Sequence, residues 1–316
     1  MAQRGLRAQQ PGRTRKLAIV MAVGKDAPEY AAAFSVLQQA LGALGWKQGD
    51  NLQIDDRWST ASHDRARAAA QEVIASRPDA ILGQSVPVIE ALMSATHAVP
   101  IIFVHVADPV VSGLVSNLAR PEGNVTGITN IVPSIGAKWL QLLKEMAPAV
   151  TRAALLINPD TQPDRGAVFL RPFEAAAPSL GVTSVKGEVH DLVGIEALMA
   201  SLAGEPRGGV VVIPDAFFAS HSTQIVALAR RFSLPAVYPY RYYVAEGGLL
   251  SYGVNNVELF RLAAPYIDRI FRGAKPSDLP IQQPTRFDLV INMKTAKALE
   301  LTVPQALQAS AGEIIE

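Results

Sequence analysis

At 316 residues the chain is longer than the roughly 250–300 residues over which one hydrophobic core usually grows, so two domains are expected. Hydrophobic residues make up 49% of the chain and charged residues 18%, which is too apolar for intrinsic disorder. The formal net charge of +1 argues against a nucleic-acid partner, and the absence of cysteine excludes disulfides and thiolate chemistry.

The first half of the chain alternates strands with helices. A helix over 27–44 begins at a capping box of Asp26, Pro28 and Glu29, and its apolar face repeats every three or four residues. This order of elements predicts a mainly parallel sheet with helices on both faces. The expected strands are 16–21, 52–57, 80–83 and 101–104, and the expected helices are 27–44, 63–76 and 87–96.

The second half repeats the alternation and then adds a tail. A further helix over 258–271 is expected to end at Gly273, followed by a strand at 287–292 and a last helix near 295–301. These additional segments are expected to cross between the two halves. The repeated strands are 153–157, 183–188, 210–213 and 236–238, and the repeated helices are 163–180, 194–202 and 220–232.

An internal repeat accounts for this symmetry. Thr14-Arg15 before an apolar run recurs as Thr151-Arg152, and Val99-Pro100 recurs as Leu234-Pro235. We therefore expect an α/β fold of two similar doubly wound parallel-sheet lobes, joined by a multi-strand hinge. The predicted lobes are 15–126 with 254–283 at the N-terminal side and 127–253 with 284–316 at the C-terminal side, and 1–14 is interpreted as the disordered remnant of a leader.

Glycines mark the predicted boundary between the lobes. Gly123 and Gly127 flank the exit from the first lobe, and Gly247, Gly248 and Gly253 mark the return. Glycines absorb the backbone rotation of a closing hinge, but ordinary turns use them as often, so both interpretations stay open.

Sequence signals for catalysis are weak. No Walker A loop or dinucleotide-binding glycine loop is present, and none of the five histidines lies in an H-E-x-x-H motif. Ser85 follows a strand as a nucleophile would, but Pro87 replaces the second glycine of that motif, so a helix-capping serine is favoured. We expect no enzyme activity, no metal and no cofactor.

Polar groups instead gather at the carboxyl ends of predicted strands, where open α/β sheets bind ligands. Ser85 and the N–H groups after it suit a carboxylate or phosphate, and Asp215 suits either a ligand ammonium or hydroxyl, or the N-cap of the next helix. The candidate ligand-binding residues are Gly24, Gln84, Ser85, Val86, Asp108, Asn130, Asn158, Asp160, Asp215, Phe217, Tyr240 and Arg241.

Aromatic residues are concentrated in one segment. Five of the seven tyrosines lie within fifteen residues, and they are Tyr238, Tyr240, Tyr242, Tyr243 and Tyr252. Their rings would either stack on a flat ligand or pack in the core. Both interpretations stay open for each ring.

Several motifs resemble the ABC-transporter substrate-binding family of type I periplasmic binding proteins, in the branch related to tryptophan and tyrosine uptake. The resemblance spans about residues 15 to 305, and its motifs include Val106–Val110, Asn124–Gly127, Lys138–Lys144, Gly248–Gly253 and Val290–Lys297. It implies a two-lobed clamp that closes on a small molecule in an interlobe cleft and delivers it to a membrane permease. It also implies a monomeric, periplasmic protein whose export signal is absent from this chain.

The resemblance also implies roles for single residues. Ser85-Val86-Pro87 resembles the helix start that holds an amino-acid carboxylate, and Asp215 resembles the acid that meets the amino group. Two residues depart from the family pattern: Ala216 stands where the family often has asparagine, and Tyr240 stands where a small or acidic residue is common. The resemblance therefore predicts only the class of ligand, an aromatic amino acid or a related aromatic carboxylate. Two alternatives are a nucleotide-sugar enzyme of the glycosyltransferase kind and a sensory ligand-binding domain.

Overall fold

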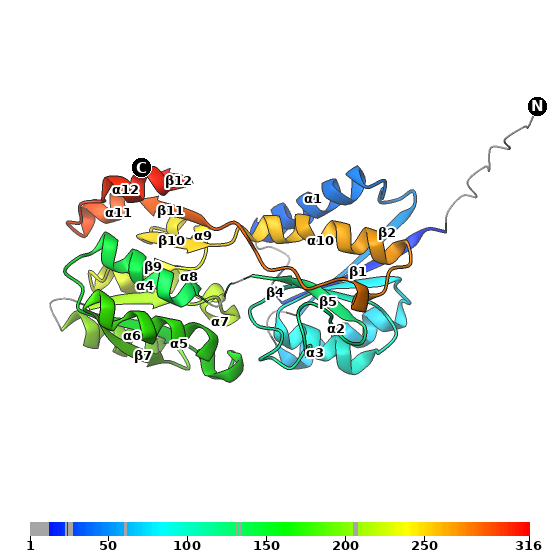
Figure 1. The fold of residues 1–316 in the computed structure, drawn as a ribbon, viewed down its shortest axis with the longest axis horizontal. Helices are drawn as coiled ribbons and strands as arrows, with labels where there is room; N and C mark the ends of the chain where they lie inside the picture. Colours follow the sequence, from blue (N-terminus) through cyan, green and yellow to red (C-terminus); the bar gives the residue numbers. More distant parts are fainter. Residues whose placement is uncertain are drawn as a thin grey trace, which may run out of the picture. The chain divides into compact units, whose positions relative to one another are not determined.

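The computed structural model describes residues 13–22, 24, 28–59, 62–130, 132, 134–204 and 208–316 (Figure 1). The chain forms two compact units. Unit 1 contains the chain up to Val104 with Ala119–Gly127 and Phe260–Pro280, and unit 2 contains His105–Leu118, Ile128–Leu259 and Ile281–Glu316. The expected capping residue Asp26 and most of the expected leader, residues 1–12, lie outside the described residues.

The sheet of unit 1, in which only the last residues of β4 and β5 belong to unit 2, has the strand order β2-β1-β3-β4-β5. Strand β1 pairs in parallel with both β2 and β3. The four predicted strands are confirmed, but β5 was not predicted because Gly123 and Gly127 suggested a linker. Gly127 instead lies inside β5, where an added Cβ would lie 2.3 Å from the Phe103 carbonyl oxygen, so the glycine permits close packing. The strands are β1 (Arg15–Met21), β2 (Leu52–Trp58), β3 (Ala80–Gln84), β4 (Ile101–Val106) and β5 (Val125–Thr129).

Helices cover both faces of this sheet, with α1 and α10 on one side and α2 and α3 on the other (Figure 1). Leu37 and Leu41 of α1 are fully buried, as their spacing predicted, and α10 is followed by Gly273 at a φ of +99°. The helices are α1 (Pro28–Ala43), α2 (His63–Ala75), α3 (Val86–Ala95) and α10 (Asn256–Phe271), with a short 3₁₀ turn at Pro276–Asp278.

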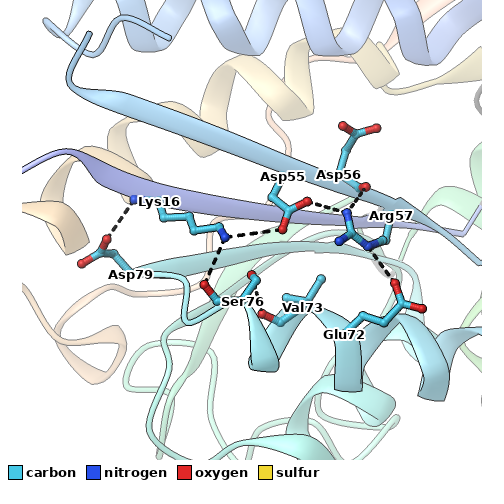
Figure 2. Close-up of polar contacts among 8 residues, drawn as sticks. All are labelled: Lys16, Asp55, Asp56, Arg57, Glu72, Val73, Ser76 and Asp79. Atoms are coloured by element: carbon cyan, nitrogen blue, oxygen red, sulfur yellow. Dashed lines mark hydrogen bonds and ion pairs between the residues drawn. The ribbon is translucent and has the colours of Figure 1, made fainter. Parts of the chain in front are cut away.

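A charged network joins β1, β2 and α2 in unit 1 (Figure 2). Arg57 forms ion pairs with Asp55 and, at 2.9 Å, with Glu72, and Lys16 Nζ lies 3.7 Å from Asp55. Burial by itself raises the pKa of the Asp55 carboxyl, but the hydrogen bond and charge of Arg57, with the charge of Lys16, outweigh it and hold the pKa below its ordinary value. The network is internally paired, so we interpret it as structural support for the edge strand β2.

The lowered pKa of Asp55 predicts a pH dependence of stability. The ionised carboxylate stabilises unit 1 at pH values above its unfolded pKa of about 3.9, and this contribution is lost as the pH falls through the folded pKa. Asp55→Asn should therefore lower the free energy of unfolding by about 1 kcal/mol at pH 7, and by less as the pH approaches 3.

Denaturant unfolding monitored from pH 7 to pH 3 measures this difference. The matched control is Asp64→Asn, because Asp64 pairs with Arg67 at a fully exposed position, with 88% of its side chain accessible. That pair should contribute little at any pH. Equal pH dependence of the two variants would contradict the prediction.

The sheet of unit 2 has the strand order β12-β11-β10-β9-β8-β6-β7. Pairing is parallel from β10 to β7, whereas β10 and β11 are antiparallel. The final strand β12 and the pairing of the tail with this sheet were not predicted. The strands are β6 (Arg152–Ile157), β7 (Thr183–Glu188), β8 (Gly208–Val212), β9 (Ala236–Tyr238), β10 (Leu250–Gly253), β11 (Asp288–Asn292) and β12 (Glu313–Ile315).

The helices of unit 2 include several that the sequence did not predict: α4, α7, α9 and α12. The predicted helix over 163–180 was too long, because Asp164 and Arg165 have φ values of +48° and +50° and Pro178 begins a separate 3₁₀ turn. The helices are α4 (Ile135–Met146), α5 (Ala167–Ala176), α6 (Leu192–Ala203), α7 (Ala216–Ser220), α8 (Ser222–Arg231), α9 (Arg241–Ala245), α11 (Met293–Ala298) and α12 (Gln305–Ser310), with 3₁₀ turns at Pro163–Gly166 and Pro178–Leu180.

The two sheets share one topology. The order β2-β1-β3-β4 in unit 1 matches the order β7-β6-β8-β9 in unit 2, with helices at corresponding positions between the strands. Because parallel crossovers are right-handed, the reversal of direction after β2 and after β7 places helices on both faces of each sheet. The predicted pair of doubly wound lobes is therefore confirmed.

The glycines after α9 serve close packing within unit 2. An added Cβ at Gly253 would lie 1.9 Å from the Pro239 carbonyl oxygen, and one at Gly248 would lie 2.6 Å from the Tyr238 ring. Side chains larger than hydrogen do not fit at either position without movement of the backbone or of a buried ring.

Among the helices of the described residues, none is long and apolar enough to cross a membrane.

Candidate functional site

In unit 1 the candidate residues lie at the carboxyl ends of β1 and β3. Gln84, at the end of β3, is buried, and its Oε1 accepts a hydrogen bond of 3.1 Å from the N–H of Ala22 after β1. Gln84 therefore joins the two strand ends. Gly24 lies just beyond and is exposed, and no atom of the described residues lies within 4 Å of the place that a Cβ would occupy.

Ser85 has an unusual backbone conformation at the start of α3. Its φ of 74° and ψ of 158° fall in a region that is essentially restricted to glycine, and its side chain makes no capping hydrogen bond. The expectation that the Ser85 hydroxyl caps α3 is therefore wrong. Strained residues of this kind are concentrated at ligand sites, and the N-terminal N–H groups of α3, such as that of Val86, carry the positive end of the helix dipole.

In unit 2, Asp215 joins the ends of β8 and β6. One carboxylate oxygen accepts from the N–H groups of Phe217 and Phe218 at 2.7 and 3.1 Å, so the predicted N-cap role is confirmed. The other oxygen accepts from Thr161 Oγ1 at 2.6 Å and Gln162 Nε2 at 2.8 Å. The carboxylate therefore receives four hydrogen bonds from the protein, which matches its approximate acceptor capacity.

The loop after β6 carries two further candidates. Asn158 is buried, and its Oδ1 accepts from the N–H of Asp160 at 2.9 Å, which holds the loop in a tight turn. Asp160 Oδ2 in turn lies 2.6 Å from Nδ1 of His190, which follows the neighbouring strand β7. The hydrogen bond and charge of Asp160 raise the pKa of His190.

Tyr240, after β9, contacts Asn130, after β5. Asn130 Nδ2 donates to the Tyr240 hydroxyl oxygen at 3.0 Å, and both side chains are buried. The ring of His105 lies 6.4 Å from the Tyr240 ring, and His105 has a φ of 57°, which is uncommon for a residue with a side chain. This group of Asn130, Tyr240 and His105 is called the Asn130 cluster below.

Four of the five clustered tyrosines form one continuous stack, whereas Tyr252 stacks on Phe287. Neighbouring ring centroids are 4.9 Å apart for Tyr238 and Tyr243, 4.6 Å for Tyr243 and Tyr242, and 5.8 Å for Tyr242 and Tyr240. Tyr238 and Tyr243 are fully buried, and this burial raises their pKa values. These two rings are core, and Tyr240 ends the stack at the Asn130 cluster.

Three other candidates have structural partners. Arg241 forms a two-pronged ion pair with Glu313 of β12, with both distances 2.6 Å. Asp108 Oδ1 accepts from the N–H groups of the two residues after Pro109, at 3.0 Å each, and so shapes its own turn. The Phe217 ring packs 4.4 Å from the His221 ring.

The structure thus assigns Gly24, Gln84, Ser85 and Val86 to unit 1 and the other candidates to unit 2. Thr161 belongs to the polar group predicted after β6, whereas two further residues that contact the candidates, Gln162 and His190, were not predicted. Their positions in the loops that follow β6 and β7 are the sequence signal for them. Within the described part of the chain, no group of three or more histidine, aspartate or glutamate side chains is placed to hold a metal ion.

Comparison with known proteins gives consistent matches across the chain. Residues 16–315 match the family model described as ABC transporter substrate binding protein. A tyrosine-binding protein of Clostridioides difficile is 26% identical over 264 residues, which cover 83% of this chain and 75% of that protein. Among solved structures, a conserved domain protein from Vibrio cholerae is 27% identical to this chain, with a TM-score of 0.86. An ABC domain in complex with L-Trp from Streptococcus pneumonia is 25% identical, also with a TM-score of 0.86. Each of these two comparisons covers 96% of this chain and 100% of the other chain.

Proposed function

Because the chain belongs to the ABC transporter substrate-binding protein family, we propose that it captures an aromatic amino acid and delivers it to an ABC permease. The family and the type I periplasmic binding fold are those that the sequence motifs indicated. Proteins of this family bind small molecules and work with ABC permeases, typically outside the cytoplasm. They are transport proteins, so the alternative of a nucleotide-sugar enzyme is not favoured.

The observation that carries the aromatic ligand class is the pair of relatives named for such ligands. One is a tyrosine-binding protein at 26% identity, and the other was solved with L-Trp at 25% identity, and both alignments span most of this chain. The tyrosine stack that ends at Tyr240 supports the same class, because aromatic rings favour flat partners. Binding in a cleft between the two units stays a prediction of the sequence.

Each unit contributes a polar strand end to this proposal. In unit 1, the uncapped N-terminus of α3 at Ser85 is proposed to take the carboxylate, because main-chain N–H groups and the helix dipole both favour an anion there. In unit 2, the residues after β8 and β9 are proposed to take the remainder of the solute. The protein is further proposed to act as an extracytoplasmic monomer without catalytic activity.

A thermal-shift screen with purified protein tests the proposal. L-tryptophan, L-tyrosine and L-phenylalanine should raise the unfolding temperature in proportion to the logarithm of their concentration, whereas D-glucose, D-galactose and adenine should not. The matched control for stereochemistry is D-tryptophan, which has the same composition. Stabilisation by a sugar alone would overturn the proposed ligand class. Recovery of a chemically changed solute from the mixture would overturn the proposed absence of catalysis.

A further inference from the structure

The Asn130 side-chain amide is buried, and its nitrogen has a hydrogen-bond partner whereas its oxygen has none among the described residues. Only 5% of the residue is exposed, its main-chain N–H donates to the Val106 carbonyl at 3.3 Å, and its Nδ2 donates to the Tyr240 hydroxyl oxygen at 3.0 Å. Its Oδ1 is buried and has no hydrogen-bond partner among the described residues. Buried polar atoms in folded proteins nearly always have a partner, so an oxygen in this state indicates a site for an outside donor.

The two candidate acceptors that follow β8 and β6 already receive hydrogen bonds from the protein. Asp215 receives hydrogen bonds from two main-chain N–H groups and from Thr161 and Gln162. Asn158 Oδ1 receives the N–H of Asp160. A new donor to Asp215 would have to displace one of its four bonds, whereas the Asn130 oxygen requires no displacement.

The position of Asn130 places this oxygen beside the candidate site. Tyr240, its partner, follows β9, and Asp215 follows β8, the strand next to β9 in the sheet. The strained backbone of His105, with its ring 6.4 Å from the Tyr240 ring, belongs to the same cluster. Strain and an unused buried acceptor are separate observations, and each is typical of a ligand site.

We propose that Asn130 Oδ1 accepts a hydrogen bond from the amino group of the bound solute, and that Asp215 is a positioning residue which holds Thr161 and Gln162 in place. An amide oxygen only accepts, so the solute must supply an N–H or O–H, and an amino acid supplies the ammonium. The inference rests on the proposed function for the class of solute. It assigns the amino-group contact to a different residue from the acid that the family resemblance implies.

The test compares two solutes that differ at one group. L-tryptophan carries the ammonium, and indole-3-propionate keeps the indole ring and the carboxylate but lacks it. Asn130→Leu should weaken binding of L-tryptophan by about tenfold to a hundredfold in calorimetric titration and leave the affinity for indole-3-propionate within about twofold. Asn130→Asp should retain most of the affinity for L-tryptophan, because a carboxylate accepts from an ammonium at least as well as an amide does.

A second buried asparagine provides the matched control. Both ends of the Asn292 amide are satisfied, since Nδ2 donates to the Val244 carbonyl at 3.2 Å and Oδ1 accepts from the Thr295 N–H at 3.0 Å. Asn292→Leu should therefore lower the unfolding temperature more than Asn130→Leu does, while the folded protein keeps its affinity. This control separates lost binding from lost folding.

Three results would overturn the inference. They are an unchanged affinity of Asn130→Leu for L-tryptophan, an equal loss for both solutes, and a loss in Asn130→Asp as large as that in Asn130→Leu. Each of these leaves the proposed function standing, because the parent protein still binds the amino acid. Failure of the parent protein to bind any amino acid would instead overturn the proposed function together with this inference.

Discussion

Asp215→Ala is expected to lower the free energy of unfolding of unit 2 by about 3 kcal/mol. The substitution removes the N-cap of α7 and leaves the Thr161 hydroxyl and the Gln162 amide without the acceptor that they share. A lost cap costs about 1 kcal/mol, and hydrogen bonds to a buried charged group contribute about 1.5–3 kcal/mol each, although such terms do not add fully. Denaturant unfolding, followed by hydrogen exchange within unit 2, measures the loss.

Two control variants separate the roles of Asp215. Asp191 caps α6 through a single hydrogen bond of 2.8 Å to the Gly194 N–H at an exposed position, so Asp191→Ala should cost only about 1 kcal/mol. Asp215→Asn removes the charge and keeps one capping oxygen. If Asp215 is a positioning residue, Asp215→Asn should keep its affinity for L-tryptophan within about fivefold; a hundredfold loss in a stable variant would show that the charge itself meets the ammonium.

The repeated strands could be predicted from sequence because each is a short, buried, apolar run. Residues 17–20, 80–82 and 210–212 are fully buried. Short, continuous apolar runs of this kind are typical of strands in a parallel sheet that helices cover on both faces. The recurrence of Thr14-Arg15 as Thr151-Arg152 indicated two lobes of one design, because the same order of strands and helices in both halves implies the same topology. The family motifs then indicated the function class directly.

The missing elements were short or unusual. Helices α7 and α9 have five residues each, which is too short for an apolar periodicity, although Asp215 was recognised as a possible N-cap. Strand β5 has a glycine at a position where Phe103 packs, and a strand with glycine at its centre resembles a linker in sequence. Such elements are fixed by tertiary contacts, which local sequence patterns do not contain.

The candidate site was predictable in position but not in detail. Strand ends located Gln84, Asp215 and Tyr240, because polar residues after buried strands are few. Their partners depend on pairs far apart in the chain, such as Asn130 with Tyr240, which are 110 residues apart. The four hydrogen bonds of Asp215 and the unpartnered oxygen of Asn130 follow from such pairs, which the sequence alone does not show.

Trp139→Ala is expected to destabilise unit 2 by about 3–5 kcal/mol, the largest loss foreseen for a single substitution here. The Trp139 side chain is completely buried in α4, its ring centroid lies 5.7 Å from that of Phe169 in α5, and its Nε1–H donates to the Tyr252 carbonyl of β10 at 2.6 Å. It therefore connects two segments that carried the family resemblance, Lys138–Lys144 and Gly248–Gly253. Hydrogen exchange should show faster opening of α4, α5 and β10.

The contributions of packing and of the hydrogen bond can be measured separately. Trp139→Phe keeps an aromatic ring against Phe169 but leaves the buried Tyr252 carbonyl without its donor, which predicts an intermediate loss of about 1–3 kcal/mol. Trp46 in unit 1 is the matched control, because it also packs on a phenylalanine and bonds through Nε1 but is only half-buried. Trp46→Ala should cost clearly less than Trp139→Ala, since the cost of a truncated ring scales with the buried area and the cavity that it leaves. Equal losses would contradict the prediction that the deeper burial of Trp139 sets the cost.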